Sequence, residues 1–401
     1  MNKLLPVVFF LISVQALACQ KMLPFNLLGD TSVESEIPLS DSVFFREQCL
    51  FACGSYGSRS YRIPAICTLN DGTILVVNDK RKYNNDDLPQ DIDIVCRRST
   101  DGGLTWSLPI TIIHGTGYKQ GYGDPGMVVC RNGDVVLTFV GGNGLFASTD
   151  DDPISTYICR SIDGGVTWSK PVNLTKVLWG KNAHNPVCGN YKGAFCASGN
   201  GLRLKRGEYK GRIMFVAAMC RKDANVLDNF LVYSDDDGLS WKVSELAFPC
   251  GDEAKVVELA DGRILMSIRQ SGARGYALSN DGGNTWGVRG SWPEMSTNAC
   301  NGDILRLGAT DDGSERNILL HSITNSMNRE KVSVFISYNE GQSWQSPVLL
   351  CNGPSAYSSL TLQHDGTIGC YVEKITPNGC ELWYQNFTYA WLLSQLENDN
   401  Q

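Results

Sequence analysis

The stretch Ser99–Trp106, STDGGLTW, decides the fold because the chain repeats it four more times. The shared pattern is Ser-x-Asp-x-Gly-x-Thr/Ser-Trp, and only the last copy replaces the aspartate, with Asn339. The copies are Ser99–Trp106, Ser161–Trp168, Ser234–Trp241, Ser279–Trp286 and Ser337–Trp344. The aspartate oxygen can accept backbone N–H bonds inside a turn, and the glycine supplies a left-handed backbone. Such a box, repeated after short apolar runs, predicts a repeat architecture.

A second repeat interleaves with the boxes. It consists of X-Gly dipeptides between apolar runs, which are typical of tight hairpins. These dipeptides are Asp71-Gly72, Asn132-Gly133, Lys210-Gly211, Asp261-Gly262, Asn301-Gly302 and Asp365-Gly366. Two hairpins per unit mean four antiparallel strands, which is one propeller blade. The alternation therefore predicts an all-β, six-bladed β-propeller. The last unit lacks a box, so we expect an early strand near Asp41–Leu50 to complete it and close the ring.

Length and composition limit the class of protein and its domain organisation. The chain has 401 residues, 42% of them hydrophobic, and a formal net charge of −7, which argues against a nucleic-acid binder. We predict a signal peptide at 1–18, an N-terminal lead-in at 19–43, the propeller at 44–392 and a frayed tail at 393–401.

The first residues resemble a secretory signal. Lys3 gives a positive start, Leu4–Leu11 is nearly all apolar, and Ala16-Leu17-Ala18 is a small-x-small cleavage pattern. This predicts a secreted or cell-surface protein. A transmembrane anchor is the alternative, but the apolar run is short for a span, and no later stretch is long enough. Cys19 directly follows the cleavage pattern and could carry a lipid anchor.

The fifteen cysteines leave two interpretations open. In a secreted chain they are typical of disulfides, but several lie inside predicted strands, where free buried thiols fit equally well. There is no Cys-x-x-Cys pair and there are only four histidines, so no zinc site is predicted.

Charged residues cluster at one end of the predicted strands. In an antiparallel blade, the residues just before the innermost strand, the end of the second strand and the loop after it share one face of the ring. These positions hold Arg62, Arg81, Asp86, Asp87, Asp124, Glu253, Arg269, Arg329, Tyr357 and Glu373. Four arginines and several carboxylates at one mouth indicate a site for a small anionic ligand. The boxes should lie on the opposite face, in a structural role.

At this point the chain resembles the sialidases, or neuraminidases, which are secreted or cell-surface exo-glycosidases with six-bladed propellers. The resemblance runs from about Phe44 to Trp391. It rests on Arg62-Ile63-Pro64, on the repeated Asp boxes, on the E-x-x-VVEL-x-DGR-x-LM-x-x-R pattern from Glu253 to Arg269, and on Tyr357 in AYSSL.

The resemblance implies a role for each residue of the mouth. Arg62, Arg269 and Arg329 form the triad that grips the sialic acid carboxylate, and Glu373 orients Arg62. Tyr357 is the nucleophile and Glu253 its base.

The resemblance also implies the following roles toward the rest of the sugar. Asp87 is the general acid/base on the aglycone side, with Asp86 as the alternative. Asp87 is preferred because it heads an Asp-x-Pro step. Arg81 and Asp124 contact the O4 region of the sugar, and Met127 is a candidate for the apolar N-acetyl pocket.

The implied activity is hydrolysis of α-ketosidic sialic acid with retention, through a tyrosyl–sialyl intermediate. A carboxylate nucleophile would meet the sugar's own carboxylate, which a neutral phenol avoids. The glutamate base and the arginine charges should assist deprotonation of the phenol. No metal or cofactor is implied. The partners would be sialylated glycoproteins, glycolipids or oligosaccharides.

Two other functions remain open. A trans-sialidase would use the same residues and pass the sugar to an acceptor galactoside. A non-catalytic sialic-acid lectin is the second alternative, although loss of the nucleophile or its base would then be expected, and Tyr357 and Glu253 are both present.

Overall fold

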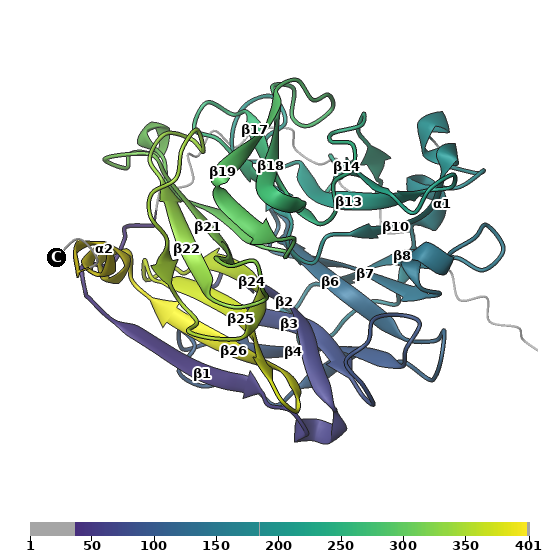
Figure 1. The fold of residues 1–401 in the computed structure, drawn as a ribbon, viewed down its shortest axis with the longest axis horizontal. Coiled ribbons are helices and arrows are strands. Elements are labelled where there is room, and N and C mark those ends of the chain that lie inside the picture. The colour runs from purple at the N-terminus through teal and green to yellow at the C-terminus, as the bar shows by residue number, and fades with distance from the viewer. Residues whose placement is uncertain (1–36, 184, 399–401) are drawn as a thin grey trace, which may run out of the picture. The chain divides into compact units, whose positions relative to one another are not determined.

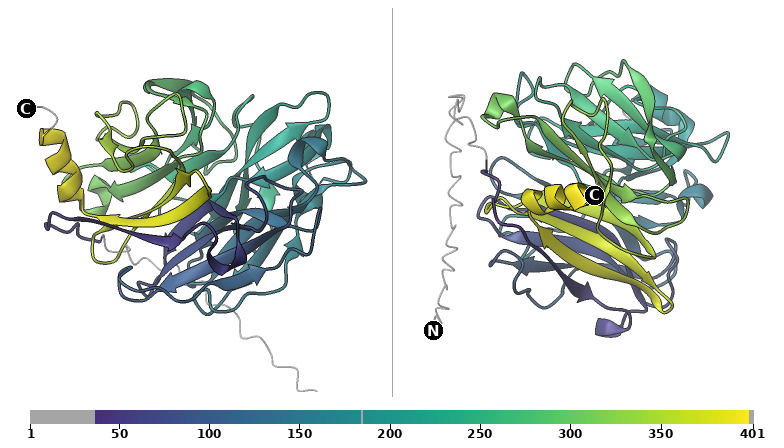
Figure 2. Two further views of the ribbon diagram at one scale, coloured as in Figure 1. Left: turned by 60° about the horizontal axis from the view of Figure 1, so that its bottom comes forward. Right: turned by 60° about the vertical axis from the view of Figure 1, so that its left-hand side comes forward.

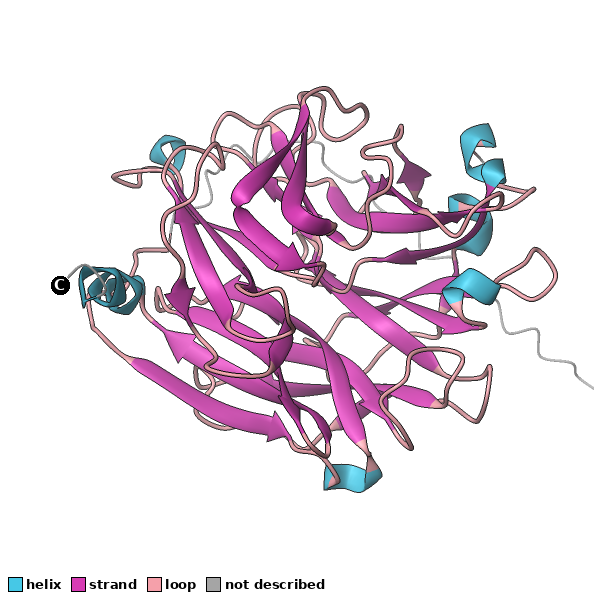
Figure 3. Ribbon diagram, viewed as in Figure 1, coloured by secondary structure: helices cyan, strands magenta, loops and turns pink. Residues whose placement is uncertain are grey.

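Six β-sheets stand around a central axis like the blades of a propeller (Figure 1) in the computed structural model, which describes residues 37–183 and 185–398. Figure 3 shows that helices are few and short and lie at the periphery. The predicted all-β, six-bladed propeller with four antiparallel strands per blade is confirmed. The predicted signal at 1–18 and most of the lead-in at 19–43 lie outside the described residues.

Each blade is numbered in chain order, with its innermost strand first. Blade one contains β2 (Ser60–Thr68), β3 (Ile74–Arg81), β4 (Ile92–Ser99) and β5 (Ile110–Ile113). Blade two contains β6 (Tyr122–Val129), β7 (Val135–Gly142), β8 (Ile154–Ser161) and β9 (Val172–Asn173). Blade three contains β10 (Tyr191–Cys196), β13 (Ile213–Arg221), β14 (Leu227–Ser234) and β15 (Lys242–Val243).

The second half of the ring repeats this order. Blade four contains β16 (Ala254–Glu258), β17 (Ile264–Ile268), β18 (Ser271–Ser279) and β19 (Arg289–Asn298). Blade five contains β20 (Asp303–Gly308), β21 (Ile318–Thr324), β22 (Val332–Ser337) and β23 (Val348–Leu349). Blade six contains β24 (Ser355–Leu362), β25 (Ile368–Thr376), β26 (Gly379–Phe387) and β1 (Phe45–Phe51). The helices are α1 (Thr175–Leu178) and α2 (Tyr389–Asn398), with 3₁₀ turns at Ser55–Gly57, Leu145–Ala147, Pro186–Asn190 and Thr310–Asp312.

The ring is closed by the first strand, as predicted. β1 pairs antiparallel with β26, with Phe45 opposite Phe387, and Figure 2 shows the two strands side by side. The strand occupies Phe45–Phe51, slightly later than the expected segment. α2 packs on this closure, where the Phe45 and Trp391 ring centroids lie 4.7 Å apart. α2 reaches Asn398, so the segment 393–398 of the expected tail is helical.

Two details differ from the sequence-based expectation. Asn301-Gly302 is not a hairpin: it precedes β20, and the turn of blade five lies at Thr310–Asp312, where Asp312-Gly313 provides the left-handed residue. Blade three has a divided inner strand. Its short segments β11 (Gly199–Asn200) and β12 (Leu202–Arg203) pair with β6 and β13.

The boxes lock each blade to the one before it. In the second box, Ser161 Oγ donates to Asp163 Oδ1 at 2.8 Å, and the Thr167 N–H donates to the same oxygen at 2.9 Å. Gly165 then approaches blade one so closely that a Cβ there would lie 2.8 Å from the Leu75 side chain. In β3 and β4, Arg81 pairs with Ile92 and Ile74 with Ser99. The first box therefore lies at the opposite end of its blade from Arg81, as expected.

Replacing Asp163 with Ala should destabilise the ring without changing the chemistry of the mouth. The substitution removes the acceptor for the Thr167 N–H, and we expect a melting temperature lower by about 2–4 °C with an unchanged rate in the folded protein. Asp163→Asn is the control. Asn339 already fills this position in the fifth box, where its Oδ1 accepts from Ser343 N at 3.0 Å. A loss of rate at unchanged melting temperature would contradict the structural role.

The boxes also predict acid sensitivity. Hydrogen bonds from Thr105 and Thr167 lower the pKa of Asp101 and of Asp163 from 3.8 to about 2. A carboxyl whose folded pKa is depressed stabilises the fold above its ordinary pKa, and this contribution is lost as pH falls toward the folded value. Stability should therefore fall between pH 4 and pH 2. Calorimetry over this range should show a shallower fall for Asp163→Asn, because an amide does not titrate; identical slopes would contradict the assignment.

The described residues also settle one open question of the sequence. Every cysteine among them is a free thiol, and most are buried in the blades. The described helices include none with the length and apolar content needed to cross a bilayer.

Candidate active site

Three innermost strands bend where they deliver a side chain to the mouth. β2, β6 and β24 each carry a β-bulge, at Arg62, Asp124 and Tyr357 respectively. A bulge re-aims side chains by breaking the alternation of the strand. Two left-handed residues support these bends, Ile63 with φ 62° and Asp124 with φ 56°. The sequence had suggested that these three residues precede their strands. In the structure they lie within the strands.

Three guanidinium groups surround one phenol. The Cζ atoms of Arg62, Arg329 and Arg269 lie 5.2, 5.4 and 6.0 Å from the centroid of the Tyr357 ring. These arginines come from β2, from the loop before β22 and from the residue after β17, so three different blades contribute. Guanidinium forks suit a planar carboxylate, and three of them around one point can hold a small anion rigidly.

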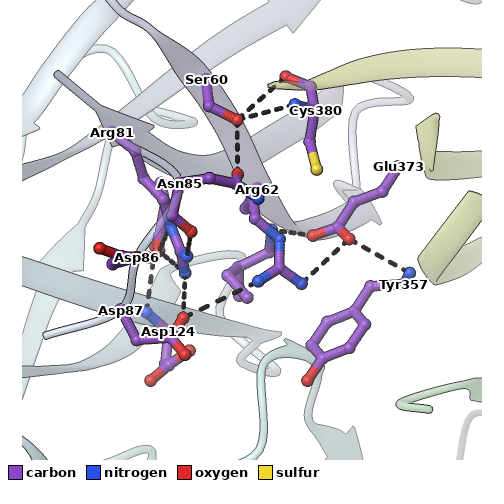
Figure 4. A network of polar contacts seen from close by, with 12 residues as sticks. Ser60, Arg62, Arg81, Asn85, Asp86, Asp87, Asp124, Tyr357, Glu373 and Cys380 are labelled. Atoms are coloured by element: carbon purple, nitrogen blue, oxygen red, sulfur yellow. Dashed lines mark hydrogen bonds and ion pairs between the residues drawn. The ribbon is translucent and has the colours of Figure 1, made fainter. Parts of the chain in front are cut away.

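Glu373, in β25, ties two of the bulges together. Its side chain is fully buried. It accepts from Arg62 Nη2 at 3.2 Å, from the Ile63 N–H at 2.7 Å and from the Tyr357 N–H at 3.4 Å, as Figure 4 shows in part. One carboxylate therefore orients the guanidinium and the backbone that carries the phenol.

The phenol is hydrogen-bonded to a carboxylate and a guanidinium. Tyr357 Oη donates to Glu253 Oε2 at 2.6 Å and accepts from Arg269 Nη1 at 2.8 Å, and Arg269 also contacts Glu253. Burial and the charge of Glu253 raise the pKa of Tyr357 well above its ordinary value. The arginines lower it, as the sequence suggested, but desolvation outweighs them. The resting phenol is therefore protonated and aimed at a carboxylate that can accept its proton.

Asp87 faces the arginines and Asp86 does not. Asp87 Oδ1 lies 2.6 Å from Arg81 Nη2 and 3.8 Å from Arg62 Nη1, whereas the Asp86 carboxylate points away in Figure 4. Desolvation raises the pKa of Asp87, but the charges of Arg81 and Arg62 outweigh it and leave the pKa below its ordinary value. Asp87 is therefore ionised in the unliganded site, while its side chain remains 73% exposed to solvent.

The sequence interpretation missed one residue, Asp79. This buried carboxylate accepts from Arg81 Nε and Nη2 at 3.2 and 2.9 Å and from the Asp124 N–H at 3.1 Å. Burial raises its pKa to about 6, and burial together with the charge of Asp79 raises the pKa of Asp124. The signal was its place two residues before Arg81, on the same face of one strand.

Met127 does not line an open pocket. Its side chain is fully buried in the core between blades one and two, in a hydrophobic cluster that also contains Val77, Leu137 and Phe139. Three residues after the bulge of β6, it points into the hydrophobic layer. This position in the core does not support the suggestion that Met127 forms an N-acetyl pocket. Among the described residues, no cluster of three or more His, Cys, Asp or Glu side chains could hold a metal ion.

Fold and site together define a six-bladed propeller whose mouth holds three arginines around a buried, carboxylate-bonded tyrosine. A family model described as "BNR repeat-like domain" matches residues 67–370, and the chain belongs to this family. It is similar to a sialidase of Micromonospora viridifaciens, with 32% identity over 376 residues, covering 89% of this chain and 56% of that protein. An exo-alpha-sialidase of Aspergillus fumigatus is 28% identical and is covered over 87% of its length, with 85% of this chain.

Solved structures agree on the fold. The Hadza microbial sialidase Hz136 matches with a TM-score of 0.76 and 25% identity, over 86% of this chain and 69% of that one. A leech intramolecular trans-sialidase, at 17% identity and a TM-score of 0.73 over 88% of this chain and 71% of that one, shares the architecture. The chain spans 56% of the Micromonospora sialidase and 61% of a Bacteroides fragilis sialidase.

Proposed function

We propose that this protein is an exo-α-sialidase that hydrolyses terminal sialic acid from glycoproteins, glycolipids or oligosaccharides. One observation carries the proposal: three guanidinium groups from three blades surround a buried tyrosine whose hydroxyl donates to Glu253 at 2.6 Å. The arginines would bind the carboxylate of the sugar and place its anomeric carbon against the phenol. A neutral nucleophile suits this carbon because it carries a carboxylate.

The contacts of Tyr357 and Asp87 support the following sequence of steps. Tyr357 Oη attacks the anomeric carbon while its proton passes to Glu253, and the bond to the glycosidic oxygen breaks. Asp87, protonated once substrate is bound, gives its proton to that oxygen. It then deprotonates the water that cleaves the tyrosyl–sialyl bond, and the phenol recovers its proton from Glu253. Two displacements at one carbon give retention.

The ionised resting state of Asp87 fits this cycle. Its pKa is held down by Arg81 and Arg62. A substrate carboxylate on Arg62 would neutralise part of that charge, and the bound sugar would exclude water from the exposed side chain. Both effects raise the pKa of a carboxyl group, which favours the proton-donating form only after substrate has bound.

The test is hydrolysis of an aryl α-sialoside and of defined sialyllactoses by the full chain. We expect release of sialic acid, with the α-anomer appearing first in proton NMR. A β-anomer first would exclude the double displacement, and no release would overturn the proposed function. Added lactose distinguishes the outcomes: sialyllactose as the main product would assign the protein as a trans-sialidase, and binding without turnover would assign it as a lectin.

The N-terminal signal leads to a proposal about location. We propose that 1–18 directs export, that the protein acts outside the cell or at its surface, and that Cys19 is the lipid attachment point. Metabolic labelling with a fatty acid, compared between the natural chain and Cys19→Ser, tests the anchor; equal labelling would exclude it.

A further inference from the structure

Asp79 stands behind the mouth and touches two of its residues at once. Its side chain is 1% exposed, as is that of Arg81. In the pairing of β2 with β3, Asp79 lies opposite Arg62, and Arg81 follows two residues later on the same face. One carboxylate thus sits between the arginine-lined part of the site and the strand that carries Asp124.

The two oxygens of Asp79 serve different strands. Oδ2 accepts from Arg81 Nε at 3.2 Å and from Arg81 Nη2 at 2.9 Å, within β3. Oδ1 accepts the backbone N–H of Asp124, in β6, at 3.1 Å. This second bond crosses from blade one to blade two at the bulge of β6.

The bulge depends on this contact. Asp124 has a φ of 56°, a backbone conformation that residues other than glycine rarely adopt. The preceding residue, Gly123, packs so closely that a Cβ there would lie 3.2 Å from Asp79 Oδ2. The carboxylate therefore supports both the left-handed backbone of Asp124 and the direction of its side chain.

Arg81 is held from two sides. Asp79 binds one edge of its guanidinium, while Nη1 donates to the Asn85 carbonyl at 2.7 Å and Nη2 contacts Asp87 at 2.6 Å. Without Asp79, the Nε–H would lose its acceptor, and the buried cation would be left with Asp87 as its carboxylate partner. We expect the guanidinium to turn toward Asp87 and to leave the orientation in which Asp79 holds it.

We propose that Asp79 is a positioning residue for the part of the site formed by Arg81 and Asp124, and acts on the substrate only through them. The inference rests on the proposed function, in which these two residues contact the O4 region of the sugar. Asp79 itself lies behind them, away from the reacting carbon.

The experiment compares Asp79→Asn with the natural chain on an aryl α-sialoside and on its 4-deoxy analogue. Asparagine keeps one acceptor, but its amide must point a donor at either Arg81 or Asp124, so one contact is lost. For the parent substrate we expect KM to rise about 10-fold or more, with kcat changing less than about 3-fold. For the 4-deoxy analogue, which lacks the contacted group, the rise in KM should be less than about 3-fold.

Asp93→Asn is the matched control. Asp93 is equally buried in the neighbouring strand β4 and pairs with Lys82 at 2.9 Å, outside the residues assigned to the mouth. Asp93→Asn should lower the melting temperature and should change KM equally for the aryl α-sialoside and its 4-deoxy analogue. If Asp79→Asn does not fold, Asp79→Glu replaces it, since glutamate keeps the charge but moves the oxygens that accept from Arg81 and from the Asp124 N–H, and it should show the same substrate pattern.

The outcomes are distinct. Equal rises in KM on both substrates, a fall in kcat alone, or the same pattern in Asp93→Asn would overturn the positioning role while leaving the proposed function intact. No hydrolysis by the natural chain would remove the proposed function, and this inference with it.

Discussion

Tyr357→Phe is expected to abolish turnover while the ring stays folded. The change removes one oxygen, which donates to Glu253 at 2.6 Å and accepts from Arg269 at 2.8 Å. The aromatic ring of residue 357 and its packing against the three arginines are unchanged. Without a nucleophile, kcat on an aryl α-sialoside should fall on the order of 10³-fold or more, whereas affinity for the sugar should change little.

The control is Tyr371→Phe in the neighbouring strand of the same blade. Tyr371 lies opposite Ser359 across β24 and β25, is fully buried, and donates its hydroxyl to Asn78 Oδ1 at 2.8 Å. It loses the same atom from a comparable environment, so stability should fall by about 1 kcal/mol with kcat unchanged. Should the Tyr357 variant keep a rate within about 10-fold of the natural protein, Tyr357 would not be the nucleophile.

Glu253→Gln is expected to give the second largest effect. The carboxylate is 3% exposed and is shared between the phenol and Arg269. A neutral amide cannot take the proton that the phenol must lose, and this phenol is held protonated by its buried environment. We expect kcat to fall by about 10²–10⁴-fold, with a smaller change in KM.

Glu258→Gln is the matched control, in the strand β16 that begins directly after Glu253. Glu258 is a buried carboxylate and the last residue of β16, and it accepts from the Lys205 and Arg206 N–H groups at 2.8 and 3.0 Å. Its replacement should lower the melting temperature and leave kcat within about 2-fold of that of the natural protein. Matching losses of kcat in the two variants would mean that Glu253 acts through the stability of the blade and not as a base.

Much of the site could be predicted from the sequence. Position on a strand was enough to gather Arg62, Arg269, Arg329 and Tyr357 at one mouth, because alternate strands of a blade begin and end on opposite faces. Asp79 was not predicted in this way. It looks like any other charged residue of a strand until burial shows that its partners are Arg81 and the backbone of Asp124.

The inner strands show the same limit. Arg62 and Asp124 were expected just before their strands, but each lies at a bulge inside one. The bulges depend on carboxylates from other strands, Glu373 and Asp79, which accept the N–H groups of Ile63 and Asp124. Local residue patterns carry no record of such contacts.

The repeat of boxes and hairpins was sufficient to define the ring, the number of blades and the face that bears the charged residues, since turns and strand alternation are set by neighbouring residues. Packing between distant blades was needed for the rest. It turns Asp87 toward the arginines and Asp86 away, and it buries Met127 in the core. It also raises the pKa of Tyr357, which the arginine charges by themselves would have lowered. Desolvation and close contact depend on which segments meet in space, and that information is spread over the whole chain.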